Sequence, residues 1–220
     1  MRKNKLSLLT AVVSAAVLAL CSCGSEKKKS SETAPVKKAA ASMTSDEMLK
    51  ADFSGVTEAS SGPVLSISNT TCKAGETTEV TLSVSGTEEK WNSCGLHITY
   101  PKELKCVHKS SDTDDIRFTL GDASEGSGAS IGLECAADLS DELTSNGLSS
   151  IFFTTIFTEH GFDGDIMTFY LDIPADAQSG TVYPIGLFYY TNDNFKSIDS
   201  DDSYQLYAFS NFKGGTVTVE

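Results

Sequence analysis

The sequence is poor in the residues on which catalysis and metal binding usually depend. It has three histidines in 220 residues, His97, His108 and His160, and none has a metal-ligand spacing such as HExxH. We therefore expect a protein that binds rather than catalyses, without catalytic residues, a metal site or a cofactor of its own.

Calcium-binding loops are also missing. Acidic clusters occur at 112–115, 192–194 and 199–202, but none has the central glycine and closing glutamate of an EF-hand loop. Solvated loops explain these clusters more simply.

Basic residues are scarce, and most of them lie near the N-terminus. Residues 1–61 contain nine Lys/Arg and six Asp/Glu, a net charge of +3, whereas the whole chain has −13, so residues 62–220 carry −16. A domain this acidic repels phosphate backbones, which argues against nucleic acid as a partner.

The first residues form the only long apolar run, and they have the pattern of a lipoprotein signal. Basic residues at positions 2, 3 and 5 precede an apolar stretch from Leu6 to Leu20, which is too short to span a bilayer comfortably. Cys23 has an aliphatic Leu20 three positions before it and a small Ser22 directly before it. We predict a signal peptide over 1–22 and lipid attachment at Cys23. An ordinary signal peptide with incidental cysteines is the alternative.

Residues 23–61 lack apolar periodicity and are rich in Ser, Ala, Lys and Glu, which predicts a flexible linker after the lipidated N-terminus. A single helical turn within 44–53 is compatible with a capping residue at Thr44 or Ser45. We expect this segment to stay mobile and to give the domain reach from a membrane.

From position 62 onward, short runs of alternating apolar and polar residues are separated by turn residues. This period of two is typical of half-buried strands. Residues 138–147 instead predict a loop with a helical turn. About nine strands and no long helix predict an all-β domain over 62–220, a nine-stranded β-sandwich with jelly-roll topology.

Four passages of this domain, taken in order, resemble the cohesin family, the receptor modules of cellulosomes. They are the K-A-G-E-T turn between the alternating runs of 64–84, the segment Cys94–Leu104 with Tyr-Pro at positions 100 and 101, the Asp-Gly turn, strand and P-A-D-A-x-x-G segment of 163–185, and the final strand entered through Gly214 and Gly215. Segments 110–130 and 138–147 are longer than a minimal cohesin needs. Either 131–135 or 151–157 corresponds to the family's sixth strand, and we prefer 151–157 because an Asp-Gly turn follows it.

The resemblance implies a non-catalytic module that binds calcium-loaded dockerins on one flat sheet, with the calcium held by the partner. Together with the lipid signal, it implies a monomeric protein anchored in the membrane, on the extracellular face, that tethers cellulosomal enzymes or scaffoldins.

Alternation along three strands then nominates the partner-binding residues. On the third strand, Leu96, Ile98 and Tyr100 face the core, and on the eighth strand Tyr183, Ile185 and Leu187 do so. The side chains predicted to face outward toward a partner are Gly95, His97, Thr99, Phe152, Thr154, Ile156, Gly186, Phe188 and Tyr190. Two exposed aromatics, Phe188 and Tyr190, are typical of a protein interface.

Two alternatives concern those aromatics. The loop 191–212 could fold over Phe188 and Tyr190 and hide them. They could instead form a sugar-stacking platform on a carbohydrate-binding jelly-roll lipoprotein.

Four cysteines lie in the predicted domain: Cys72, Cys94, Cys106 and Cys135. Four cysteines allow three pairings, and free buried thiols are equally compatible with the sequence.

Overall fold

The computed structural model describes Met48 and residues 62–111, 115–125, 134–138, 141–189, 193–199 and 203–220. These residues belong to one compact unit that begins at Lys37. The predicted signal peptide, the lipidation site Cys23, Tyr190 and the linker apart from Met48 lie outside the described residues.

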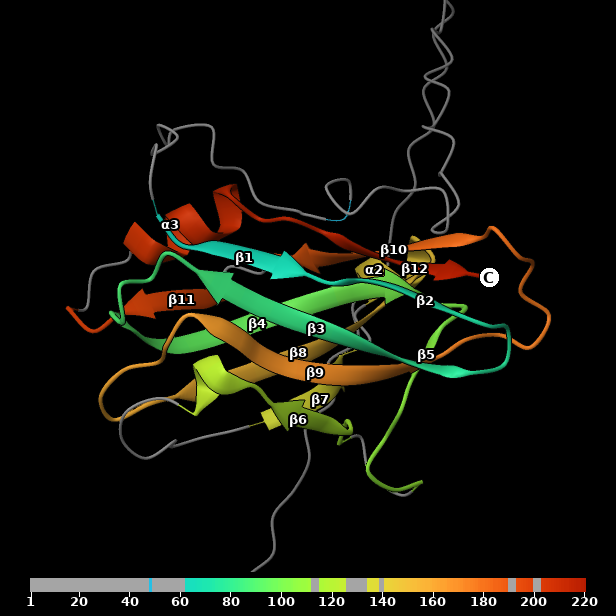
Figure 1. Cartoon of the computed structure of the whole chain (residues 1–220), viewed down its shortest axis with the longest axis horizontal. Helices are drawn as coiled ribbons and strands as arrows, with labels where there is room; N and C mark the ends of the chain where they lie inside the picture. Colours follow the sequence, from blue (N-terminus) through green and yellow to red (C-terminus); the bar gives the residue numbers. More distant parts are fainter. Residues whose placement is uncertain are drawn as a thin grey trace, which may run out of the picture. The chain divides into compact units, whose positions relative to one another are not determined.

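Two β-sheets pack face to face (Figure 1). The first has the order β1-β3-β9-β5, with β6 also paired to β9. The second has the order β2-β12-β10-β4-β8-β7, with β11 also paired to β4. The strands are β1 Val64–Ile67, β2 Asn69–Cys72, β3 Thr77–Ser85, β4 Trp91–Pro101, β5 Lys105–Cys106, β6 Phe118–Leu120, β7 Glu134–Asp138, β8 Leu148–Ile156, β9 Gly164–Asp172, β10 Val182–Phe188, β11 Asn194–Ser197 and β12 Gly215–Val219.

The prediction of an all-β sandwich is confirmed, but the described part of the chain has twelve strands rather than nine. Sequence reasoning did not separate β2 from the first strand and missed β11, because their sequences, NTTC and NFKS, are polar and too short to show alternation. The jelly-roll topology stays a prediction.

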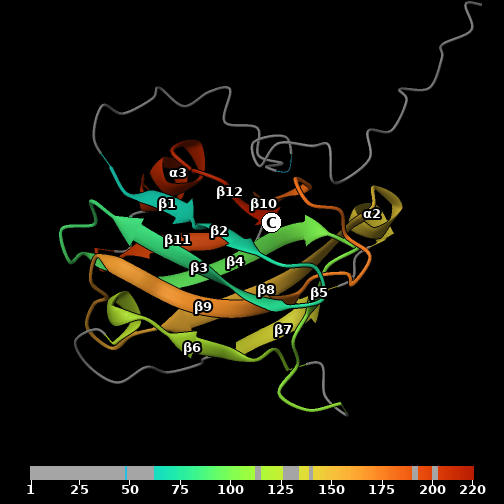
Figure 2. The same ribbon diagram turned by 45° about the vertical axis from the view of Figure 1, so that its right-hand side comes forward.

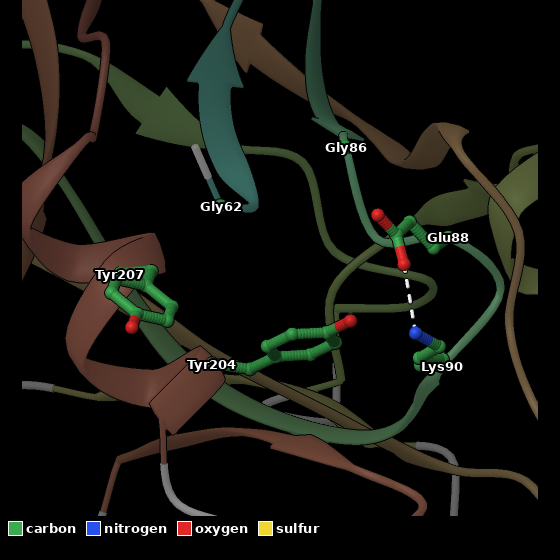
Figure 3. A pocket seen from close by; sticks show the side chains of 6 residues that line it. All are labelled: Gly62, Gly86, Glu88, Lys90, Tyr204 and Tyr207. Carbon is green, nitrogen blue, oxygen red and sulfur yellow. Dashed lines mark hydrogen bonds and ion pairs between the residues drawn. The ribbon is translucent and has the colours of Figure 1, made fainter. Parts of the chain in front are cut away.

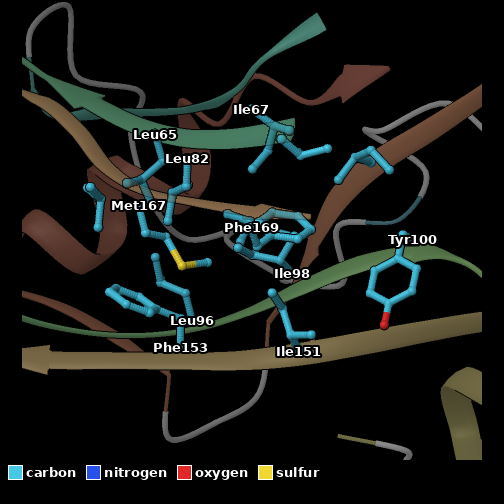
Figure 4. Close-up of a cluster of buried hydrophobic side chains, with 14 of the residues drawn as sticks. Leu65, Ile67, Leu82, Leu96, Ile98, Tyr100, Ile151, Phe153, Met167 and Phe169 are labelled. Carbon is cyan, nitrogen blue, oxygen red and sulfur yellow. The ribbon is translucent and has the colours of Figure 1, made fainter. Parts of the chain in front are cut away.

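The core lies between the two sheets, and alternation along each strand fills it. In β3, Val80, Leu82 and Val84 are buried while the residues between them are more exposed. Figure 4 shows how the first sheet contributes Leu82 and Phe169 and the second sheet contributes Ile98 and Phe153 to the same cluster. Burial of such apolar side chains contributes about 1.5–3 kcal/mol each, which explains why the register of every strand is fixed.

The first predicted strand changes sheets at Ser68. Residues 64–67 pair with β3 in the first sheet, whereas residues 69–72 pair in parallel with β12 in the second. Gly215 permits this crossing, because a Cβ there would lie only 2.2 Å from the carbonyl oxygen of Ser68. The need for a glycine at the start of β12 therefore has a steric reason.

Three short helical segments interrupt the strands. The predicted helical turn within 138–147 is α2, Asp141–Ser145, and a 3-10 turn, η2, covers Asp122–Ser124. The longer helix α3, Ser203–Ser210, was not predicted, and it packs against β1 and β11 (Figure 2). Among the described helices, none has the length and apolar character that a membrane span requires.

Candidate docking face

Strand β4 is the centre of the candidate site. One of its edges pairs with β8 from Ser93 to Pro101, and the other is shared by β10 near Ile98 and β11 near Cys94. The predicted core residues of β4 and β10 all belong to the sandwich core. The other side of this sheet, which we call the outer face, therefore has Gly95, His97 and Thr99 in its middle row.

His97 is fixed at the point where β10 leaves β4 and β11 joins it. Its backbone N–H donates to Asp193 Oδ2 at 3.3 Å, and its ring Nδ1 lies 2.8 Å from Asp193 Oδ1. Because a carboxylate only accepts hydrogen bonds, Nδ1 carries the proton. The Asp193 side chain is 2% exposed and that of His97 is 12% exposed, so the aspartate completes the sheet where no strand carbonyl is available.

Sequence reasoning treated Asp193 as part of a solvated loop, and that interpretation is wrong. Its carboxylate is buried against His97, and Gln205 Nε2 donates to its backbone carbonyl at 2.6 Å. No local pattern signals this role, because the two residues are 96 positions apart.

Phe152 lies beside Gly95 and His97 on the neighbouring strand. Its ring centroid is 4.7 Å from that of His97, and a Cβ on Gly95 would come within 3.4 Å of Phe152 Cζ. Because Gly95 has no side chain, the Phe152 ring has space to lie beside it. The contact area next to Gly95 therefore comes from Phe152 of β8.

The rest of this half of the face is more exposed. Thr154 Oγ1 donates to the carbonyl of Cys94 at 3.0 Å, and Ile156 is 41% exposed at the end of β8. On the other side of β4, β11 adds Asn194 opposite Gly95 and the exposed Lys196 opposite Ser93. We call Gly95, His97, Phe152, Thr154, Ile156, Asn194 and Lys196 the open half of the outer face.

Phe188, one of the two predicted partner-binding aromatics, does not present a platform. Phe188 faces away from the core as expected, but it is only 6% exposed, and Tyr190 lies outside the described residues. Phe188 is covered by Met48, Leu143 and Leu148. Within the described part of 191–212, residues 194–197 extend the sheet as β11, and no residue of this segment belongs to the cluster around Phe188. A buried Phe188 offers no ring face to a sugar.

Thr99 and Gly186 are also buried, although both were predicted to be outward and available. They lie opposite each other in the register of β4 and β10, and Thr99 is 0% exposed. Alternation correctly placed both side-chain positions on the outer face, but it could not show that a second layer covers them.

That second layer includes a residue of the predicted linker. Met48 is helical and 2% exposed, and it clusters with Leu143 of α2. The prediction that segment 44–53 stays mobile is therefore wrong at Met48, which packs on the domain because it finds an apolar surface there.

The described thiols are free and buried. Cys72, Cys94 and Cys106 form no disulfide, and burial raises the pKa of both Cys94 and Cys106 to about 12. Only the thiolate is a good nucleophile or metal ligand, so these groups are packing residues. Within the described residues, no three His, Cys, Asp or Glu side chains gather closely enough to hold a metal ion.

A pocket of about 570 Å³ lies beside the turn between β3 and β4 (Figure 3). Its lining residues are Gly62, Gly86, Glu88, Lys90, Tyr204 and Tyr207. Lys90 Nζ donates to Glu88 at 2.7 Å, and Tyr204 Oη donates to the carbonyl of Thr87 at 2.9 Å. These polar groups satisfy one another and hold the turn against α3, so their arrangement assigns no ligand to the pocket.

No family model and no curated protein matches the sequence. The similarities to known proteins are therefore structural. The fold is similar to the type III cohesin module from the cellulosomal ScaE cell-surface anchoring scaffoldin of Ruminococcus flavefaciens. The two share 27% identity over 73% of this chain and 89% of the other, with a TM-score of 0.58. The chain carries a cohesin domain.

Two further cohesins have the same fold at lower identity. The sixth cohesin of scaffoldin B from Acetivibrio cellulolyticus, in complex with a mutant Cel5 dockerin, matches with 15% identity and a TM-score of 0.51 over 73% of this chain and all of its own. A non-cellulosomal cohesin from Archaeoglobus fulgidus matches with 10% identity and a TM-score of 0.50 over 73% and 92%. The cohesin fold is thus common to proteins in and outside cellulosomes.

Proposed function

We propose that this chain is a cell-surface, lipid-anchored cohesin that binds dockerin modules on the outer face of the sheet and so tethers enzymes or scaffoldins. The observation that carries the proposal is the cohesin fold. It is supported by a relative that comes from a cell-surface anchoring scaffoldin and by another that was solved with a dockerin. The chain acts by binding alone and is not an enzyme.

The open half of the outer face is suited to such an interface. It combines a large apolar side chain, the exposed Ile156, with Phe152 and with polar groups at its rim, among them Lys196. Interfaces of this kind gain most of their affinity from a few apolar or aromatic anchors that are surrounded by polar residues. The calcium that dockerins need belongs to the partner, and the chain binds as a monomer.

Calorimetry with dockerins from the same genome, with and without EDTA, tests the proposal. Ile156→Asp should weaken binding more than tenfold, because it places a charge in a desolvated contact. Leu120→Asp is the matched control, since Leu120 is 37% exposed and lies on β6 of the opposite sheet. Absence of binding to every dockerin, or equal loss in both variants, would contradict the proposal.

Lipid anchoring needs a separate test. The full chain expressed in a bacterium should partition into the detergent phase of a Triton X-114 extract and incorporate a labelled fatty acid. Cys23→Ser should abolish both properties. Unchanged partitioning of the variant would favour a different anchor or none.

A further inference from the structure

A second apolar cluster covers part of the outer face and is separate from the sandwich core. Its members are Met48, Leu143, Leu148 and Phe188, which are 2%, 1%, 3% and 6% exposed. They come from the segment before the sandwich, from α2, from the start of β8 and from the end of β10. Three of the four therefore belong to the sandwich or to its helix α2, and only Met48 comes from upstream.

The strand registers place this cluster over Thr99. Leu148 of β8 lies opposite Pro101 of β4, and Phe188 of β10 lies opposite His97. Thr99 is midway between those two positions and points to the same face. A cluster that joins Leu148 to Phe188 must therefore cross above Thr99, which accounts for its complete burial.

Thr99 is an unusual residue to bury in this way. Its Oγ1 has no hydrogen-bond partner among the described residues. A buried hydroxyl that makes no hydrogen bond destabilises the fold, and native structures contain few of them. A polar group of a partner, or water, that reaches this hydroxyl would remove the cost.

We propose that Thr99, Leu143, Leu148 and Phe188 form an apolar subsite of the docking face, which Met48 of the same chain occupies until a partner binds. This inference rests on the proposed dockerin-binding function and names the chemistry of one contact. A partner side chain of the size of Met, Leu or Ile takes the place of Met48. A polar partner group beside it hydrogen-bonds to Thr99 Oγ1. Together with the open half, the vacated subsite makes one continuous interface along β4, from Gly95 to Pro101.

The occupied subsite lowers the apparent affinity for the partner. A ligand that binds only the uncovered state has its dissociation constant multiplied by the reciprocal of the fraction uncovered. Removing the Met48 side chain should then tighten dockerin binding by the reciprocal of the uncovered fraction, about threefold where roughly one third of the molecules are uncovered.

The test compares Met48→Ser with Met43→Ser in the full chain. Both variants remove a methionine from the same linker, and Met48 is the one that the cluster of described residues contains. We expect calorimetry to show tighter dockerin binding by about threefold for Met48→Ser, and unchanged binding for Met43→Ser. In a Phe188→Ala background, which removes the subsite itself, Met48→Ser should have no further effect.

Oxidation of Met48 gives an independent readout of its displacement. Hydrogen peroxide should oxidise Met48 slowly in the free protein and faster in the dockerin complex, as measured by peptide mass spectrometry. The unfolding transition of each variant, followed by the fluorescence of Trp91, verifies that the domain is folded.

The outcomes separate the two proposals. If the unmodified chain binds dockerin but Met48→Ser binds no more tightly and Met48 stays protected in the complex, the subsite is wrong and the docking function stands. If the unmodified chain binds no dockerin, both proposals are overturned.

Discussion

Asp193 binds His97 twice, through the backbone N–H and through the ring, across a separation of 96 positions. This pairing secures the place where β10 and β11 share the edge of β4. It therefore holds together the two strands that flank the middle row of the docking face.

Asp193→Ala should lower the free energy of unfolding by about 1.5–3 kcal/mol, because two hydrogen bonds to a buried carboxylate are lost. Asp199→Ala is the control, since it removes a charge from an exposed position six residues later. Urea unfolding followed by Trp91 fluorescence measures both. Equal stability of the two variants would show that the pairing contributes nothing.

The lowered pKa of Asp163 predicts that the free energy of unfolding depends on pH. Partial burial by itself raises the pKa of this carboxyl, but hydrogen bonds from the Thr87 hydroxyl and from the backbone N–H groups of Thr87 and Gly86 outweigh it and lower the pKa. A pKa that is lower in the folded state contributes stability above the unfolded value near 3.8, and this contribution is lost as the pH falls through the folded value.

Asp163→Asn should therefore cost about 1 kcal/mol at pH 7, a modest value because the carboxylate is solvent-exposed. The difference between the variant and the unmodified protein should shrink as the pH falls below about 4. Asp176→Asn, which removes an exposed carboxylate, is the control. A difference that is constant between pH 7 and pH 3 would contradict the assignment.

The turn between β3 and β4 stores backbone strain that a glycine would relieve. Glu88 and Glu89 have φ values of 52° and 56°, and Lys90 N–H donates to the carbonyl of Thr87 at 3.0 Å across them. A residue with a Cβ pays about 1–2 kcal/mol in this left-handed region. Glu89→Gly should therefore raise stability by about 1 kcal/mol, whereas Glu89→Ala, which keeps the Cβ, should leave it nearly unchanged. A gain of the same size in both variants would attribute the effect to charge.

The buried thiols should resist alkylation in the folded domain. Because burial raises the pKa of Cys94 and Cys106 to about 12, almost no thiolate is present at neutral pH. Peptide mapping after iodoacetamide treatment should find both residues unmodified in buffer and modified in urea. Rapid modification of either cysteine in buffer would show that the site opens.

Alternation along the strands was sufficient to predict which side chains enter the core. The inward set of β4, Leu96, Ile98 and Tyr100, follows from a period of two, because a strand that slips by one residue would expose every apolar side chain. The resemblance to cohesins was readable for a similar reason, since turn residues and strand spacing are local features of the sequence.

The tertiary structure alone decided which of the outward-facing side chains are exposed and which are covered. Phe152 and Phe188 both face away from the core, yet the first belongs to the open half of the face and the second is buried under Met48 and α2. Long-range contacts of this kind, like the pairing of Asp193 with His97, leave no periodic signal in the sequence. The sequence by itself determined the sandwich and the two sides of its sheets, and only the packing of distant segments decided which part of the docking face is open.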